Sequence, residues 1–279
     1  MSLLKKKINF NNKKSDFFIL SLFCKKNNFN HSYVLNQALE QNTINDENQN
    51  LLFNFINSFK NLEEIRSQLY QDVFASFIIN NKFEKTFLEF GATNGVDLSN
   101  SIILEKHFDW KGMLAEPSPQ WHQELKKNRP NTKIITDCIW SKSNEELNFF
   151  VSDVGVLSTI ETFKESDKLS MPGNTDERIK NGKVIKVKTI SLNNVIKYHF
   201  NSKSPSYISI DTEGSEYEIL KNFDFKFFRP LVLTIEHNFT SIEKKIDELM
   251  IKNEYVRVFK KLTSFDGWYV AREVFNEIN

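Results

Sequence analysis

The chain has 279 residues, enough for one large domain or for a domain with an N-terminal extension. Its 37 Lys and Arg balance 36 Asp and Glu to a formal net charge of +1, which gives the whole chain no attraction for nucleic acid or anionic membranes. Two cysteines exclude a disulfide framework and, without closely spaced Cys and His ligands, predict a cytoplasmic protein that lacks a zinc site.

The N-terminal part, residues 1–80, is expected to be a partly helical extension of a main domain over 81–279. Apolar residues in 48–80 recur at spacings of three and four, which is typical of one or two amphipathic helices. An apolar run at 17–24 follows several lysines, but it is short and lacks a cleavage site of small residues. We expect a short buried element there, and no run approaches the ~20 apolar residues of a membrane span.

From residue 86 the sequence alternates between strand and helix patterns at short spacing. Strands are expected at 86–92, 112–118 and 132–140, with helices at 98–108 and 119–128. Pro119 suits the first turn of the second helix. This order predicts an α/β fold with a mostly parallel, doubly wound sheet.

The second half interrupts this pattern and then resumes it. Residues 146–153 are expected to form an edge or hairpin strand. Residues 155–183 contain glycines and a proline, and we expect them to form a mobile loop over an active site. Ser191 is a plausible N-cap. The remaining expected elements are strands at 184–190, 207–214 and 231–237, helices at 191–200, 215–222 and 240–252, and an antiparallel C-terminal pair at 255–262 and 267–272.

The turn after the first strand reads "FGATNG" and holds Gly91 and Gly95 in a chain with 8 glycines in all. A dinucleotide-binding turn has a further glycine between these two, which lets the backbone reach the phosphates. Its absence weakens the case for NAD. A ligand with ribose and adenine but no phosphate, such as S-adenosylmethionine, tolerates the difference; a tight turn without a ligand is the other interpretation.

Polar and acidic residues follow several of the expected strands. In open α/β sheets ligands bind beyond the carboxyl ends of the strands, and buried unpaired charges are costly, so these acids indicate a site. They are Glu116 with Pro117 after the second strand, Asp137 with Cys138 in the third, Asp211 and Glu213 in the resumed fourth, and Glu236 with His237 in the fifth.

Five blocks in this order resemble the FkbM family of S-adenosylmethionine-dependent methyltransferases. They are "FLEFGATNGVDLSNSIILEK", "GMLAEPSPQ", "KTISLNNVI", "YISIDTEGSEYEILKN" and "LVLTIEHN", and the resemblance covers about residues 67–272. The block D-x-E-G-x-E at 211–216 is the most specific. The resemblance implies a Rossmann-like class I methyltransferase fold and methyl transfer, usually to a hydroxyl oxygen of a sugar, a glycan or another small polar acceptor.

The resemblance also implies roles for residues at the strand ends. The turn from Gly91 through Asn94 to Gly95 would hold the methionine part of the cofactor, and Glu116, followed by Pro117, would take the ribose hydroxyls. Asp137 and Cys138 would lie near the adenine, where the family has small neutral residues. Asp211 and Glu213 would line the junction between cofactor and acceptor. S-adenosylhomocysteine would be the product.

Methyl transfer to a hydroxyl needs a general base within hydrogen-bonding reach. The candidates are Asp211, Glu213 and His237. The two acids alternate on one expected strand, so they would point the same way, and together they could bind a divalent cation instead. Glu213 could also cap the next helix, and His237 could be a hydrogen-bonding residue at a strand end.

Two further alternatives stay open on the sequence. Glu89, just before Gly91, either anchors the methionine amino group or is a buried acid paired with a backbone donor. At the level of function, the alternative is a protein of the NAD type or a non-catalytic nucleotide-binding module.

Overall fold

The computed structural model describes residues 65–79, 82–260 and 263–278. In the helical pattern expected over 48–80 it contains α4 (Gln71–Ile79). The part of that pattern before residue 65, like the apolar run at 17–24, lies outside the described residues. Helix α4 packs into the core of the main sheet, so residues 71–79 share that core.

A seven-stranded sheet forms the centre of the molecule, in the order β10-β11-β9-β8-β1-β2-β3. Five neighbouring strands are parallel, and β11 pairs antiparallel with both β9 and β10. The predicted mostly parallel α/β sheet with an antiparallel C-terminal strand is confirmed. The strands are β1 (Thr86–Phe90), β2 (Lys111–Ala115), β3 (Lys133–Ile135), β8 (Tyr207–Ile210), β9 (Val232–Glu236), β10 (Tyr255–Val258) and β11 (Asp266–Ala271).

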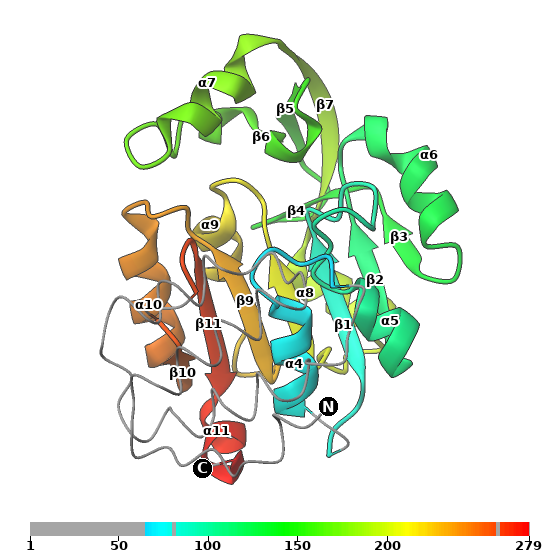
Figure 1. Cartoon of the computed structure of the whole chain (residues 1–279), viewed down its shortest axis with the longest axis vertical. Coiled ribbons are helices and arrows are strands. Elements are labelled where there is room, and N and C mark those ends of the chain that lie inside the picture. The colour runs from blue at the N-terminus through cyan, green and yellow to red at the C-terminus, as the bar shows by residue number, and fades with distance from the viewer. Residues whose placement is uncertain (1–64, 80–81, 261–262, 279) are drawn as a thin grey trace, which may run out of the picture.

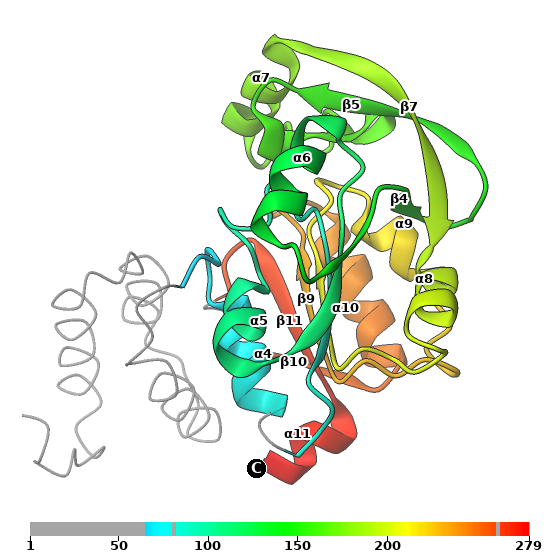
Figure 2. The same cartoon turned by 90° about the vertical axis from the view of Figure 1, so that its right-hand side faces the viewer.

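Helices cover both faces of this sheet, as a doubly wound fold requires. Helices α4 and α5 lie on one face, and α8 and α10 lie on the other (Figure 2). Ser191 is the N-cap of α8, as expected, and its side chain accepts from the amide of Asn194. Besides α4, the helices that accompany the main sheet are α5 (Ile102–Phe108), α6 (Pro119–Asn128), α8 (Leu192–His199), α9 (Glu216–Leu220), α10 (Ile242–Lys252) and α11 (Arg272–Ile278).

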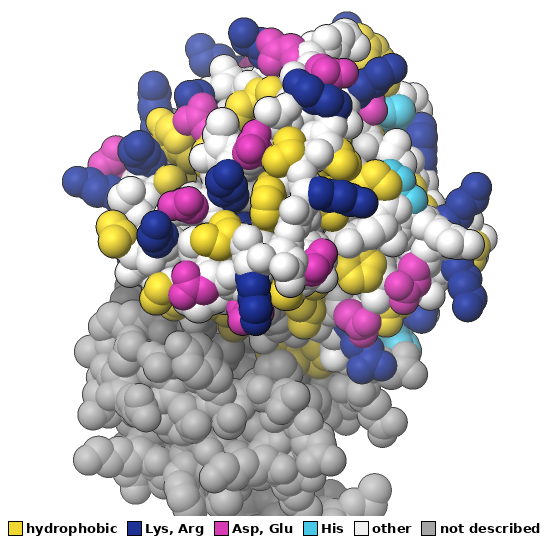
Figure 3. Space-filling model, turned by 90° about the horizontal axis from the view of Figure 1, so that it is seen from above, with side chains coloured by type: hydrophobic (Ala, Val, Ile, Leu, Met, Phe, Trp, Pro, Cys, Tyr) yellow, Lys and Arg dark blue, Asp and Glu magenta, His cyan; other side chains and the backbone are white. Residues whose placement is uncertain are grey.

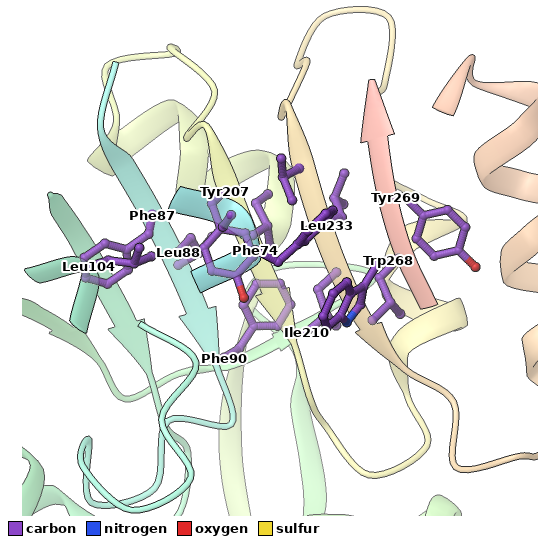
Figure 4. Close-up of a cluster of buried hydrophobic side chains, with 14 of the residues drawn as sticks. Phe74, Phe87, Leu88, Phe90, Leu104, Tyr207, Ile210, Leu233, Trp268 and Tyr269 are labelled. Atoms are coloured by element: carbon purple, nitrogen blue, oxygen red, sulfur yellow. The ribbon is translucent and has the colours of Figure 1, made fainter. Parts of the chain in front are cut away.

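The core lies between the sheet and its helices, where strand residues with β-branched or aromatic side chains meet the apolar faces of the helices (Figure 4). Phe74 of α4 stacks on Trp268 of β11, with ring centroids 4.5 Å apart. Phe87 and Tyr207, paired across β1 and β8, are fully buried. These contacts fix the two central strands, whose carboxyl ends carry the site.

The expected strand over 132–140 is two strands that belong to different sheets. β3 joins the main sheet, whereas β4 (Cys138–Trp140) pairs with β7 (Gly182–Ser191) in a second, four-stranded sheet of order β4-β7-β5-β6. The chain breaks from strand geometry at residues 136–137. Asp137 is therefore in a connection, and this part of the prediction was wrong because the continuous apolar pattern does not show which sheet a residue joins.

Residues 146–191 form a unit, here called the cap, that rises above the carboxyl ends of the main strands (Figure 1). The expected loop over 155–183 was wrong: this stretch contains helix α7 (Pro172–Lys180) and the short strand β6 (Thr159–Ile160). β5 (Glu146–Ser152) lies between β7 and β6 and pairs antiparallel with both, and its pairing with β6, the next strand in the chain, corresponds to the hairpin alternative. The remaining short elements are the 3-10 turns η2 (Gly155–Leu157) and η3 (Glu161–Phe163).

Seen from above, over the cap, the surface mixes Lys and Arg with Asp and Glu and with hydrophobic side chains (Figure 3). This face does not gather the cations that a phosphate backbone attracts, in keeping with the near-neutral sequence. Several smaller boundaries also differ from expectation. Helix α5 begins at Ile102, β10 ends at Val258, and β8 ends at Ile210, before the acids that follow it.

Candidate functional site

A cavity of about 240 Å³ lies between the carboxyl ends of the main strands and the cap. It is at the point where the strand order reverses, since β1 leads to β2 on one side and is flanked by β8 on the other. Residues after β1, β2, β8 and β9 form its floor, and cap residues such as Leu157 and Met171 form its roof. One end carries the glycine turn, and the other carries the acids.

The glycine turn comes close to the loop after β8, and this explains Gly91. The residue has φ of +79°, and an added Cβ would lie 1.9 Å from the carbonyl oxygen of Asp211. Two residues on, Thr93 has φ of +46° and directs its amide at a carboxylate oxygen of Glu116, 2.8 Å away. The turn therefore exposes backbone to the cavity while it holds an acid from the neighbouring strand.

Glu116 lines the cavity, and both of its carboxylate oxygens accept backbone hydrogen bonds. Oε2 accepts from Thr93 and Oε1 from Ser118, each at 2.8 Å. Burial raises the pKa of this carboxyl to about 7, against the lowering effect of the two amides. The side chain is fixed in place yet keeps unused lone pairs toward the cavity.

The other predicted cofactor residues divide into two groups. Pro117 and Cys138 line the cavity, and burial raises the pKa of the Cys138 thiol to about 12, which keeps it protonated. Asn94, Gly95 and Asp137 are not among the lining residues. Asn94 accepts the amides of residues 96 and 97, and so shapes the turn.

Glu89 is buried behind the turn and does not line the cavity. It accepts the amide of Asn100 at 2.7 Å and hydroxyl hydrogen bonds from Ser99 and Ser101. Burial raises its pKa, and nearby Arg129 opposes that effect. The contacts correspond to the alternative that we gave for this residue, a buried acid paired with backbone and hydroxyl donors, and they fix the loop before α5.

That loop brings a residue to the cavity that sequence reasoning missed. Asn100 lines the cavity and is only 6% exposed. Its amide nitrogen donates to Ser209 Oγ at 3.0 Å, whereas its Oδ1 has no partner among the residues that the structure describes. An unpaired buried oxygen is costly, so a ligand donor would satisfy it. The polar run before the helix is the only signal in the sequence.

At the opposite end, Asp211, Glu213 and Glu236 bring their carboxylates together. One oxygen from each lies within 4.8 Å of the other two. The expected alternation of Asp211 and Glu213 along a strand was wrong, because β8 has ended and Glu213 has φ of +58°. The left-handed turn, and not strand period, directs both acids into the cavity.

Burial, together with repulsion from neighbouring carboxylates, raises the pKa of all three acids. For Asp211 and Glu236 the pKa rises well above the usual range, first by burial and then by the neighbouring carboxylates. For Glu213 burial raises the pKa to about 7, although Arg178 opposes it. Glu216 is held by the amides of Thr212 and Gly214 and closes the start of α9.

Arg178 of the cap reaches down to the acids, and nothing in the sequence indicated it. Its side chain is fully buried and donates to Glu213 Oε2 at 2.5 Å and to both oxygens of Asp167 at 2.6 and 3.1 Å. It also donates to the carbonyl oxygens of Leu157 and Lys164. One guanidinium thus joins α7, the η2 and η3 turns and the loop after β8.

His237 has a different environment from the acids. It is 2% exposed and is not among the residues lining the cavity. Arg257 donates to Nε2 at 3.1 Å, and the amide of Phe239 contacts Nδ1 at 3.2 Å. Burial lowers its pKa to about 4, so the ring is neutral. Its neighbour Asn238 lines the cavity instead.

A glycine turn, an acid after the second strand and further acids after β8 at one cavity are the features that the resemblance implied. The chain matches the family model of the methyltransferase FkbM domain over residues 89–263. It belongs to the FkbM methyltransferase domain family. The matched region contains β1 from Glu89 onward, the cap and all the acids of the cavity, and membership supports a methyltransferase.

Two solved structures are similar to this chain. One is a methyltransferase FkbM from Methylobacillus flagellatus KT, 14% identical with a TM-score of 0.43; the match covers 84% of this chain and 57% of that one. The other is a precorrin-6y C5,15-methyltransferase from Geobacter metallireducens GS-15, 10% identical with a TM-score of 0.36; the match covers 75% of this chain and 90% of that one. This chain therefore spans little more than half of the first structure. No curated protein matches it in sequence.

Among the described residues, no helix has both the length and the hydropathy of a membrane span.

Proposed function

We propose that the protein is an S-adenosylmethionine-dependent methyltransferase that methylates a hydroxyl oxygen of a sugar, a glycan or another small polar acceptor. The observation that carries this proposal is Glu116, whose two oxygens are held by the amides of Thr93 and Ser118 at the cavity wall. A carboxylate fixed in this way can accept both hydroxyls of a ribose through its remaining lone pairs.

The residues around Glu116 fit the rest of that cofactor. Gly91 keeps the floor of the cavity free of a side chain, and Asn100 offers an unpaired oxygen to a donor such as an ammonium group. Cys138 and Ile139 supply an apolar wall suited to an adenine ring. A nicotinamide dinucleotide needs backbone amides that can approach its pyrophosphate. The turn between Gly91 and Gly95 lacks the middle glycine that permits this approach.

Bound S-adenosylmethionine would supply an electrophilic methyl group, so the protein must align the acceptor and exclude water. The cap covers part of the cavity and so limits the access of solvent to it. An acceptor hydroxyl becomes a better nucleophile when a carboxylate accepts its hydrogen bond, and Asp211 and Glu213 present carboxylates at the cavity. His237, held by Arg257 outside the lining, is not part of this proposed group.

The floor of the acceptor end also favours a polar acceptor. Acids and the amide of Asn238 line it, whereas the roof includes apolar residues such as Leu157 and Met171. Hydroxyl groups can donate to the acids, and the apolar face of a sugar ring can contact the roof. This combination supports a small polyhydroxylated acceptor.

The test is calorimetric titration of the full chain with S-adenosylhomocysteine, alongside NADH, and repeated with Glu116→Ala. We expect binding of S-adenosylhomocysteine, no binding of NADH, and affinity reduced at least tenfold by the substitution, since hydrogen bonds to a charged group contribute about 1.5 to 3 kcal/mol. The folded state of the variant is checked by thermal unfolding.

Two results would count against the proposal. Absence of S-adenosylhomocysteine binding to folded protein would exclude the proposed cofactor, and NADH binding in its place would favour the alternative of a protein of the NAD type. If S-adenosylhomocysteine binds, incubation with methyl-labelled S-adenosylmethionine and a panel of sugars identifies the acceptor. The labelled product is then cleaved chemically to show whether the methyl group is on oxygen.

A further inference from the structure

The three carboxylates at the acid end carry more negative charge than their surroundings offset. Arg178 pairs with Glu213, but the described residues that line the cavity include no Lys, Arg or His. Arg178 also pairs with Asp167, so one guanidinium faces four carboxylates and leaves three negative charges uncompensated if all four are ionised. Unpaired charges at a buried site are very unfavourable, so protons or a bound cation must accompany the group.

Glu236 gives a second observation, separate from the convergence of the acids. Its side chain lies at the end of β9 and is only 7% exposed. Among the described residues no N–H or O–H group donates to its Oε2. Buried carboxylate oxygens are satisfied in most proteins, and here Glu89 and Glu116 illustrate how backbone amides do so. The missing partner of Glu236 Oε2 points to a positive ligand inside the cavity.

We propose that Asp211, Glu213 and Glu236 together bind one divalent cation of the Mg²⁺ or Mn²⁺ type. In the sequence only the first two acids formed a candidate pair, and the fold adds the third from a different strand. The ion neutralises negative charge that Arg178 leaves uncompensated. In combination with the proposed function, on which this part rests, the ion would also bind the acceptor's hydroxyl oxygen.

The chemistry and size of the group fit a small hard cation. All three ligands are carboxylate oxygens, which Mg²⁺ and Mn²⁺ prefer to the softer metals bound by Cys and His. Around an ion with bonds of 2.0 to 2.1 Å, oxygens on opposite sides lie about 4.2 Å apart. The carboxylate oxygens here lie within 4.8 Å of one another, so small side-chain movements would complete the site.

The network behind the acids would keep such a site in shape. Arg178 holds Oε2 of Glu213 and is itself fixed by Asp167, which leaves Oε1 of Glu213 to turn toward an ion. Partners of this kind behind metal ligands orient them and raise affinity. A bound divalent cation also acidifies a coordinated hydroxyl, which would help an acceptor to lose its proton.

The experiment measures Mn²⁺ binding to the full chain without S-adenosylmethionine, by electron paramagnetic resonance of the free ion. We expect one Mn²⁺ for each chain, displaced by excess Mg²⁺. Glu236→Gln and Asp211→Asn, each of nearly the same shape as the parent, should weaken binding at least tenfold. Both variants should stay folded in thermal unfolding without metal, because each removes repulsion between buried carboxylates.

A crossed control separates this site from the proposed function. Glu116→Gln, at the other end of the cavity, should bind Mn²⁺ like the parent and lose affinity for S-adenosylhomocysteine. Glu236→Gln should do the opposite. Absence of Mn²⁺ binding to the parent, or binding that neither acid variant weakens, would overturn the cation site even when S-adenosylhomocysteine binds. Loss of S-adenosylhomocysteine binding alone would leave the cation site standing.

Discussion

The two ends of the cavity both contain buried carboxylates, but they satisfy them differently. At the cofactor end, Glu89 and Glu116 each accept hydrogen bonds from backbone amides, and Glu89 accepts hydroxyls as well. At the acid end, Asp211 and Glu236 face each other, and a single guanidinium from the cap contacts Glu213. The carboxylates of the cofactor end are thus satisfied without a ligand, whereas those of the acid end lack positive charge.

The two ends are therefore suited to different ligands. A carboxylate already held by amides keeps its position and still accepts further donors, which suits neutral hydroxyls such as those of a ribose. Carboxylates that face one another gain most from a cation or a proton. Both arrangements depend on the loops after parallel strands, which meet at one edge of the sheet.

The largest expected effect comes from Gly91, where the two ends touch. In Gly91→Ala the new Cβ would lie 1.9 Å from the Asp211 carbonyl oxygen, and φ of +79° disfavours any L side chain. We expect the free energy of unfolding to fall by more than about 4 kcal/mol, beyond the range of ordinary substitutions. Denaturant unfolding measures it, with affinity for S-adenosylhomocysteine lost in any protein that remains folded.

Gly173→Ala is the matched control. This glycine is in the first turn of α7, and a Cβ there meets no atom within 4 Å. Alanine is the better helix former, so the change should be neutral or stabilise by up to about 1 kcal/mol. A Gly91 variant that unfolds like this control would contradict the close packing of the turn against the loop after β8.

Much of the fold follows from the sequence because its strands are buried in a regular way. The apolar blocks around Leu88 and Ile208 predicted central parallel strands, and the resemblance to the FkbM family identified the same order. The glycine turn and Glu116 were also accessible, since a rare glycine pair and an acid at a strand end stand out against apolar neighbours. For these features local pattern and tertiary structure agree.

The acid end was less accessible because its geometry depends on turns and on the cap. Strand period placed Asp211 and Glu213 on one face, whereas the left-handed conformation of Glu213 does so in the structure. Arg178 was hidden in a polar stretch that appeared to be a loop, and Glu236 became a partner only through the pairing of β8 with β9. Contacts between distant segments leave no local periodicity to find.

The guanidinium of Arg178 is the positive charge that the cap supplies to the acids. Arg178→Met fills a similar volume but leaves Asp167 and Glu213 without their buried partner. Removing one member of a buried ion pair costs about 3 to 5 kcal/mol, and we expect a loss of that size in chemical denaturation. Arg178→Lys should recover part of it, because an ammonium keeps the charge but cannot make the paired contact to Asp167.

Lys168→Met provides the comparison within the same cap. Lys168 pairs with Glu165 at the surface, where such pairs contribute about 0 to 1 kcal/mol. Equal losses for the Arg178 and Lys168 variants would mean that Arg178 does not balance the acids. A large loss for Arg178 alone would show that the buried acids depend on the charge that the cap supplies.

The smallest expected effect is a pH dependence at the cofactor end. Burial raises the pKa of Glu116 to about 7, and only the ionised carboxylate can accept from both hydroxyls of a ribose without using an oxygen for its own proton. As pH rises from 6 to 8 the group loses its proton, so the affinity for S-adenosylhomocysteine should increase by up to about tenfold, or 1.4 kcal/mol. Calorimetry at three pH values measures it. Glu116→Gln has no proton to lose at this position, so it should bind S-adenosylhomocysteine weakly and with an affinity that does not change with pH. If the affinity of both proteins rises with pH to the same extent, another group causes the pH dependence.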